Sequence, residues 1–207
     1  MLNNITITDI TRTKKGYNAL FAGDEFLFSV DDVVLYRNNI HAGSCFSQQE
    51  LDCISKQSTN AKAVDRCYNY LATRMHSKKE LYDKLCRNYD SETARYAVAK
   101  MEQLELVNDY TFAQMKADYL LNVKMQSFSA IKAKLASLGV DKDIIDSVLL
   151  NIGPEDQTED IIHLLQTKYS TKLSQPQKVM ASLVRKGFRY REIKQAMDYL
   201  NIDLQEY

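Results

Sequence analysis

Residues 77–85 read Ser-Lys-Lys-Glu-Leu-Tyr-Asp-Lys-Leu, and residues 127–135 read Ser-Phe-Ser-Ala-Ile-Lys-Ala-Lys-Leu. Both segments open on serine, a favoured helix N-cap, and both then place apolar residues four apart. At a spacing of 50 residues, the matching positions are Ser77, Leu81, Lys84 and Leu85 with Ser127, Ile131, Lys134 and Leu135. A further spacing of 48 relates Ile131, Leu135, Gly139 and Ile145 to Val179, Leu183, Gly187 and Ile193. The pattern predicts three tandem copies of one helical unit.

Each copy is expected to hold three helices. In the first copy, the segment after residue 61 has the spacing of a one-sided helix, Ser77 to Glu80 is a capping box that begins a second helix, and a third helix follows Asp90. The positions expected to face the core are Val64, Cys67, Tyr68, Leu71, Met75, Leu81, Leu85, Ala94, Val98, Met101 and Leu104.

The junctions agree with this register. Gly139 and Gly187 each follow an apolar helix, where glycine readily adopts the left-handed C-cap conformation. Asp141, and Asn108 or Asp109, are suitable N-caps for the helices that follow. Gly153-Pro154 marks a break before the third copy, since proline disrupts a helix interior.

The first thirty residues instead predict strands over Ile5–Ile10, Tyr17–Phe21 and Phe26–Val30, with hairpin turns at Lys14–Gly16 and Gly23–Asp24. In the last strand Phe26, Phe28 and Val30 should share one face. A short helix is expected over Val33–Tyr36, and a capping box from Ser47 to Glu50 should begin another. The polar stretch Lys56–Asn60 is interpreted as a linker.

The predicted fold is therefore mainly α, with three tandem three-helix repeats forming a curved elongated array behind a small N-terminal β-hairpin or sheet module. The expected boundaries are 1–60 for the strand-containing module, then 61–107, 108–153 and 154–207 for the three repeats.

The composition limits the class of protein to which this sequence can belong. The 207 residues include 45% hydrophobic and 26% charged residues, which is typical of a globular protein. The start has no signal-peptide pattern, and no apolar stretch approaches the roughly 18 residues that span a bilayer, so a cytoplasmic protein is expected. Cys45, Cys53, Cys67 and Cys86 contain no C-x-x-C pair and are interpreted as reduced, partly buried thiols.

The charge is balanced overall, with 27 basic and 27 acidic residues, but it is unevenly distributed. Residues 168–194 hold eight basic residues against Glu192, a net charge of +7, and residues 141–160 hold seven acids against Lys142, a net charge of −6. The basic stretch favours an acidic partner, although a solvated helix face is equally compatible with it. Tyr169, Tyr190 and Tyr199 lie in or near this stretch and could stack on bases, whereas Tyr68, Tyr119 and Tyr199 have the spacing of core residues.

No catalytic signature is found. The sequence lacks the phosphate-binding loops, the H-E-x-x-H zinc motif and the G-x-S-x-G nucleophile motif. His41, His76 and His163 are too scattered for a metal site, and the acidic pairs at Asp31 and Glu155 suit helix starts. We therefore expect neither an enzyme nor a bound metal or cofactor.

The order of motifs resembles the RecX family. The similar segments are Tyr70-Leu-Ala-Thr-Arg74, Ser77 to Leu81 with Lys84-Leu85, Leu104 to Asp109 with Phe112-Ala113, and Leu183 to Phe188 with Ile193. Ile5–Ile10, Phe26–Val30 and Ser47–Leu51 are similar to the extended forms of that family. The middle repeat departs from the pattern, because an expected glycine and arginine are absent around Leu120–Phe128 and Leu138-Gly139-Val140 replaces Lys-Gly-Ile.

This resemblance implies a cytoplasmic, monomeric, non-enzymatic regulator in DNA repair and the SOS response. Such a protein lodges in the groove of the RecA filament on DNA and restrains its ATPase, strand-exchange and coprotease activities. The alternative is a helical module that binds single-stranded nucleic acid directly. Charge and repeat position select as partner-binding residues Arg74, Lys78, Lys84, Lys124, Lys132, Lys134, Lys178, Arg185, Lys186, Arg189 and Arg191.

Overall fold

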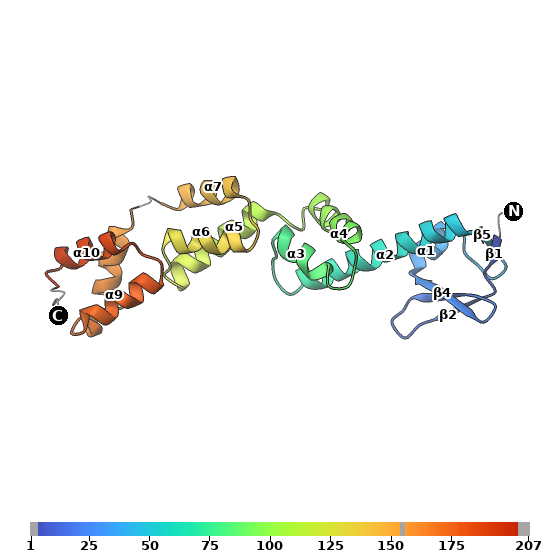
Figure 1. Ribbon diagram of the computed structural model, residues 1–207, viewed down its shortest axis with the longest axis horizontal. Helices are drawn as coiled ribbons and strands as arrows, with labels where there is room; N and C mark the ends of the chain where they lie inside the picture. The colour runs from blue at the N-terminus through green and yellow to red at the C-terminus, as the bar shows by residue number, and fades with distance from the viewer. Residues whose placement is uncertain (1–3, 154–155, 203–207) are drawn as a thin grey trace. The chain divides into compact units, whose positions relative to one another are not determined.

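The computed structural model describes residues 4–153 and 156–202. Its mainly helical fold with a small N-terminal antiparallel sheet confirms the predicted fold class (Figure 1). The chain divides into two compact units. The first contains the described residues up to Met75 and Leu81–Leu106, and the second contains His76–Glu80 and the residues from Val107 onward.

The N-terminal strands form two small sheets. Their bounds are β1 Asn4–Thr6, β2 Asp9–Arg12, β3 Asn18–Ala22, β4 Glu25–Val30 and β5 Cys45–Ser47. β2, β3 and β4 form an antiparallel meander, and β1 pairs with β5. The two predicted hairpins are confirmed.

The single strand predicted over Ile5–Ile10 is wrong. The chain leaves β1 at Ile7, whose amide donates to the Ser44 carbonyl (2.8 Å), and Thr8 N bonds to Phe21 in the other sheet (2.8 Å). The same six residues therefore serve both sheets. The predicted alternation in β4 is also interrupted, because a register shift leaves Phe26 55% exposed and turns Leu27 toward the core.

Helices α1 to α4 begin at the predicted caps. Their bounds are α1 Asp32–Arg37, α2 Gln48–Leu71, α3 Lys78–Leu85 and α4 Ser91–Gln103. Asp31 caps α1, Asp90 caps α4, and the capping box of Ser47 and Glu50 is present in both directions. The short helix predicted near Val33–Tyr36 is confirmed.

The linker predicted at Lys56–Asn60 is wrong, because these residues lie in the middle of the 24-residue helix α2. Ser58 in this stretch and Lys62, four residues further on, have their partners on β4. Ser58 Oγ donates to the Ser29 carbonyl (2.6 Å), and Lys62 Nζ donates to Ser29 Oγ (2.9 Å). A polar stretch without glycine or proline can remain helical when its buried polar side chains have hydrogen-bond partners.

Small residues bring α2 against α4. Ala63, Cys67, Ala94 and Ala97 are fully buried where the two helices pack. Tyr68 and Met75, which were expected in the core, are instead 44% and 37% exposed. The face of α2 that carries small side chains packs on α4, because small side chains let two helices approach each other closely.

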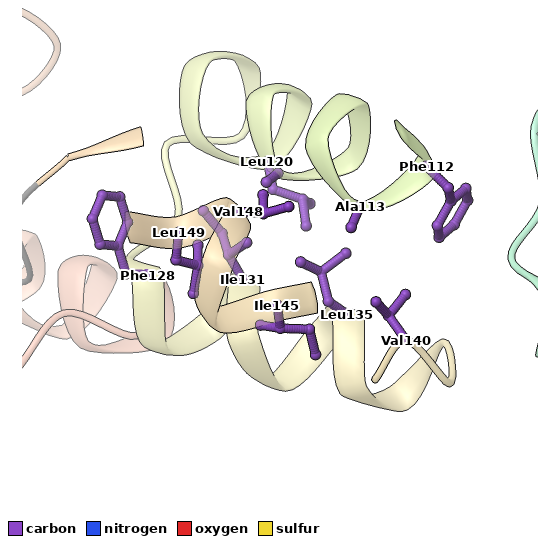
Figure 2. Packing of buried hydrophobic residues seen from close by; sticks show 11 residues of the cluster. Phe112, Ala113, Leu120, Phe128, Ile131, Leu135, Val140, Ile145, Val148 and Leu149 are labelled. Atoms are coloured by element: carbon purple, nitrogen blue, oxygen red, sulfur yellow. The ribbon is translucent and has the colours of Figure 1, made fainter. Parts of the chain in front are cut away.

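The second unit contains the remaining helices. Their bounds are α5 Asp109–Asp118, the π-helix η1 Tyr119–Val123, α6 Phe128–Ser137, α7 Lys142–Ile152, α8 Thr158–Gln166, the 3₁₀ turn η2 Ser170–Lys172, α9 Pro176–Arg185 and α10 Tyr190–Tyr199. One core lies among α5, η1, α6 and α7, where Leu120, Ile131 and Val148 converge (Figure 2). A second core is formed by α8, α9 and α10 around Leu165, Leu183 and Ile193.

The middle repeat compensates for its missing glycine. Lys124 N bonds to the Tyr119 carbonyl five residues back (3.2 Å), and Met125 then adopts a left-handed φ of 53°. A non-glycine residue in this region costs roughly 1–3 kcal/mol. The Met125 side chain packs against the core of α8–α10, which offsets part of that cost.

The starts of α3 and α6 make the same kind of contact with the repeat that follows. Ser77 Oγ donates to the Leu138 carbonyl (2.6 Å), and Lys78 N donates to Asp109 Oδ1 (2.9 Å). All four residues belong to the second compact unit.

The corresponding residues 50 or 48 positions later repeat the arrangement. Ser127 N donates to the Lys186 carbonyl (3.0 Å), and Phe128 N donates to Gln157 Oε1 (2.7 Å). We call each such set a repeat joint. It consists of an N-cap serine and the next backbone amide on one side, and a carbonyl and an acceptor side chain on the other.

A glycine completes each joint. Gly139 and Gly187 have φ of 77° and 90°, which confirms the predicted left-handed C-caps. A Cβ at Gly139 would lie 2.4 Å from Lys79 Cβ, and one at Gly187 would lie 2.7 Å from Ala130 Cβ. The glycines therefore permit both the turn and the close approach of neighbouring helices.

Candidate basic interface

The predicted partner-binding residues are distributed over both units. Arg74 and Lys84 lie in the first unit, Lys78 lies in the first turn of α3, and the other eight lie on the helices and turns of the second unit. Their role as partner contacts remains a prediction.

In the first unit, the side chain of Tyr70 organises the nearby cations. Lys84 Nζ lies 4.6 Å from the centre of the Tyr70 ring, and the Arg66 guanidinium lies 5.1 Å from it. Arg74 turns instead to the Met75 carbonyl (2.8 Å). Cations held over an aromatic face keep their charge while their stems pack on the ring.

One group of cations in the second unit contains Lys124, Lys168 and Lys186, which we call the lysine cluster. Lys186 Nζ donates to the backbone carbonyl of Lys124. Burial lowers the pKa of Lys186, and the neighbouring charges of Lys168 and Lys124 lower it further. Three like charges are thus held close together.

The lysine cluster has no acidic counterpart within residues 4–153 and 156–202, where no ion pair involves any of its three members. Lys168 Nζ lies instead 3.3 Å from Met125 Sδ. An unneutralised group of cations attracts an anionic surface.

Tyr119 lies beside this cluster at the start of η1. Lys116 Nζ and Lys124 Nζ each lie 5.6 Å from the centre of its ring. The ring is 43% exposed, so the expectation that Tyr119 is a core residue is wrong. The five-residue spacing of Tyr119 and Lys124 matches the π-helical turn.

The other tyrosines also differ from expectation. The spacing of Tyr199 predicts a core residue, but its side chain is 71% exposed, whereas Tyr169, a candidate for base stacking, is only 6% exposed. Tyr190 is 59% exposed and therefore accessible. An exposed aromatic ring with cations beside it is therefore found at Tyr119 and not at Tyr169.

Two predicted cations are neutralised locally. Lys132 forms an ion pair with Asp146, and Arg189 Nη1 lies 3.5 Å from Glu192 Oε1. Lys134 and Arg191 lie exposed on α6 and α10. Lys178 and Arg185 lie seven residues apart on α9 and line one pocket of about 440 Å³.

The sequence reasoning missed Lys168 and Lys116. Lys168 lies within the basic stretch of residues 168–194 but outside the repeat positions that select the predicted cations. Lys116 precedes Tyr119 by three residues, a spacing that places two side chains on one helix face, and this signal could have found it.

Metal-ligating residues are dispersed. Throughout the part of the chain that the structure describes, no three His, Cys, Asp or Glu side chains gather as a metal site would require. His41 and His163 are exposed, and His76 is buried near Glu80 (3.4 Å). The four cysteines are free thiols, and only Cys67 is buried. No helix among the described residues is sufficiently long and apolar to cross a membrane.

Comparison with known proteins identifies relatives along most of the chain. The family model for the first three-helix domain of RecX matches residues 63–101. Regulatory protein RecX of Listeria monocytogenes serotype 4a (strain HCC23) is 25% identical over 186 residues, which is 86% of this chain and 68% of that protein. Regulatory protein RecX of Clostridium perfringens (strain SM101 / Type A) is 27% identical over 195 residues, covering 89% and 91% of the two chains.

Solved structures agree in fold. A crystal structure of regulatory protein RecX aligns with a TM-score of 0.69 and 24% identity over 93% of this chain and 98% of that one. RecX from Lactobacillus salivarius aligns with a TM-score of 0.57 and 25% identity over 70% of this chain and 98% of that chain.

The fold and the basic interface define a protein of tandem three-helix units whose matched relatives are named regulatory proteins. The chain is similar to proteins of the RecX family along most of its length.

Proposed function

We propose that this protein binds the RecA–DNA nucleoprotein filament and modulates, mostly by inhibition, its ATPase, recombinase and coprotease activities. The observation that carries the proposal is the similarity to proteins named regulatory protein RecX over 86–89% of the chain. In this proposal the protein acts in the cytoplasm as a monomer and takes part in DNA repair. It has no cofactor and no catalytic activity of its own.

The lysine cluster supports this proposal physically. A nucleoprotein filament presents phosphates and acidic side chains, and charge complementarity accelerates association with such a surface. Lys124, Lys168 and Lys186 offer cations that no described acidic side chain neutralises. Tyr119 adds an accessible aromatic surface next to them.

The first experiment measures the DNA-dependent ATPase of RecA with increasing amounts of this protein. Substoichiometric protein should lower the rate of ATP turnover. An unchanged rate at equimolar protein would reject the proposal.

A variant assigns the interface. Lys124→Glu combined with Lys168→Glu should weaken inhibition, because two exposed cations become anions at the cluster. The matched control is Lys14→Glu with Lys15→Glu, which makes the same charge change at the exposed turn between β2 and β3. Circular dichroism should show equal helicity in both variants. Equal inhibition by both would place the contact elsewhere.

A second candidate function is direct binding of single-stranded nucleic acid, favoured by the flanking of Tyr119 by Lys116 and Lys124. Affinity for an oligothymidine, measured without RecA, should then fall with salt. Three phosphate contacts correspond to a slope of log K against log salt of roughly −2. Absent or salt-independent binding would remove this candidate.

A further inference from the structure

A pocket lies beside α9, between this helix and the turn that contains η2. We call it the α9 pocket. It has a volume of about 440 Å³. Its base includes Tyr169 and Val179, which are buried, and Tyr169 Oη lies 2.9 Å from Ser182 Oγ. This hydrogen bond ties the inner wall of α9 to the residue that precedes η2.

The charged side chains of the α9 pocket are all cationic. Lys178 and Arg185 lie on α9 with Ser182 between them, and Lys172 faces them from η2. Thr171 and Ser174 add hydroxyl groups, and no acidic side chain among the described residues lines the pocket. The lining therefore offers several hydrogen-bond donors around a concentrated positive charge.

The place of the pocket in the repeat pattern is informative. Pro176 is the first residue of α9 and corresponds to Lys78 of α3 and Phe128 of α6, whose amides donate to Asp109 and Gln157 in the repeat joints. Oxygen atoms of a following repeat thus occupy the starts of α3 and α6. Within the described residues, the start of α9 opens onto the α9 pocket, which Ser174 and Gln175 line.

We propose that the α9 pocket is a binding site for a phosphate group. The phosphate would lie along the face of α9 that carries Lys178, Ser182 and Arg185, with Lys172 of η2 on the other wall. Arg185 can bind two oxygens at once through its planar guanidinium, and Lys178 and Lys172 contribute charge. Because proline has no amide hydrogen, side-chain donors supply the contacts here.

A phosphate group fits this lining better than a carboxylate does. A carboxylate offers two oxygens in one plane, whereas three cations and several hydroxyls surround the pocket from α9 and from η2. A tetrahedral anion can accept hydrogen bonds from both walls. The phosphate can belong to a free phosphate compound or to the backbone of a polynucleotide strand.

The α9 pocket is separate from the lysine cluster, since none of Lys124, Lys168 and Lys186 lines it. Its test uses the full-length protein without RecA, so it succeeds or fails independently of the proposed filament regulation.

The experiment is isothermal titration calorimetry with two probes, inorganic pyrophosphate and a short oligothymidine without terminal phosphate. Lys178→Gln combined with Arg185→Gln should weaken binding at least about tenfold, since two charge-assisted contacts are lost. The control Arg95→Gln with Lys142→Gln removes the same charges from exposed positions on α4 and α7. The control should bind as the unmodified protein does.

The two probes distinguish the source of the phosphate. Binding of pyrophosphate that depends on Lys178 and Arg185 supports a site for free phosphate compounds. Binding of oligothymidine alone, with the same dependence, supports a contact to the strand backbone. If neither probe binds, or if the double variant binds as the control does, the proposal is wrong. Lys172→Gln on the opposite wall supplies the same readout should the double variant fail to fold.

Discussion

Gly187 shows how one residue can set the spacing between two helices. Its φ of 90° suits glycine, and an added Cβ would lie 2.6 Å from Ser127 Oγ and 2.7 Å from Ala130 Cβ. Both neighbours belong to the start of α6, where the Ser127 amide also bonds to Lys186. Both the backbone conformation and the packing at position 187 therefore require glycine.

We expect Gly187→Ala to lower the free energy of unfolding by more than backbone strain alone, which is roughly 1–3 kcal/mol for a left-handed non-glycine residue. The control is Gly23→Ala, because Gly23 has φ of 64° and nothing within 4 Å of its would-be Cβ. Urea unfolding followed by circular dichroism measures both. Equal losses in the two variants would contradict the close packing at Gly187.

Cys67 differs from the other thiols in its surroundings. It is fully buried between α2 and α4, and burial raises the pKa of its thiol to about 11. Since the thiolate is the reactive form, we expect a thiol reagent to modify Cys45, Cys53 and Cys86 in the folded protein and Cys67 only after unfolding. Mass spectrometry of the modified peptides checks this. Early labelling of Cys67 would show that the α2–α4 contact opens readily.

At the scale of elements, the repeat joint predicts which polar side chains are structural. Gln157 is 3% exposed and accepts from the buried amide of Phe128 at 2.7 Å. Replacing it with alanine leaves that donor unsatisfied, which costs about 1–3 kcal/mol. Thermal unfolding should show the loss in Gln157→Ala, and the exposed Gln166→Ala on α8 is the matched control. A joint that contributes nothing would leave the two variants equally stable.

The start of α1 makes a pH-dependent contact with the N-terminal sheet. Asp32 pairs with Arg12 of β2 and accepts from Asn18 of β3 (2.8 Å). Hydrogen bonds from Arg12 and Asn18 lower the pKa of Asp32 from 3.8 to about 2.

Because the pKa of Asp32 is lower in the folded state, the contact stabilises fully above the ordinary value and is lost as the pH falls toward 2. We expect Asp32→Asn to remove this part of the acid dependence of stability. Unfolding measured at several pH values between about 4 and 2 tests it. A variant whose stability declines with acid as steeply as the original would contradict the assignment.

Elements with a local signal were predictable. The N-caps Ser47, Asp90 and Asn108 each bond to the amides expected of them, and the glycine C-caps follow their helices as predicted. Elements without a local signal were not. The three-residue strand β5 exists because Cys45–Ser47 pairs with Asn4–Thr6, a contact 41 residues apart in sequence at Phe46 and Ile5. The polar middle of α2 is helical because β4 supplies partners for Ser58 and Lys62.

For the whole molecule, repeat periodicity predicted the fold more fully than charge predicted the site. Leu81, Ile131 and Leu183 are fully buried, as the repeat requires. The selected cations have different surroundings in the structure. Lys132 forms an ion pair with Asp146, whereas Lys186 lies near the like charge of Lys168. Such pairings depend on contacts between helices, which sequence spacing does not describe. The lysine cluster and the α9 pocket emerge only from the tertiary fold.

The repeat joints also determine how far the array can grow. Each joint needs an amide donor at a helix start and a glycine in the next repeat. If one molecule stacked on another through these surfaces, the contact would be head-to-tail, which is the kind of contact that generates fibres. The first repeat carries Tyr89 at the position of Gly139 and Gly187, and the third repeat carries Pro176 at the position of Lys78 and Phe128. Neither position therefore offers a complete joint, because Tyr89 carries a side chain where a joint has glycine and Pro176 lacks the amide hydrogen.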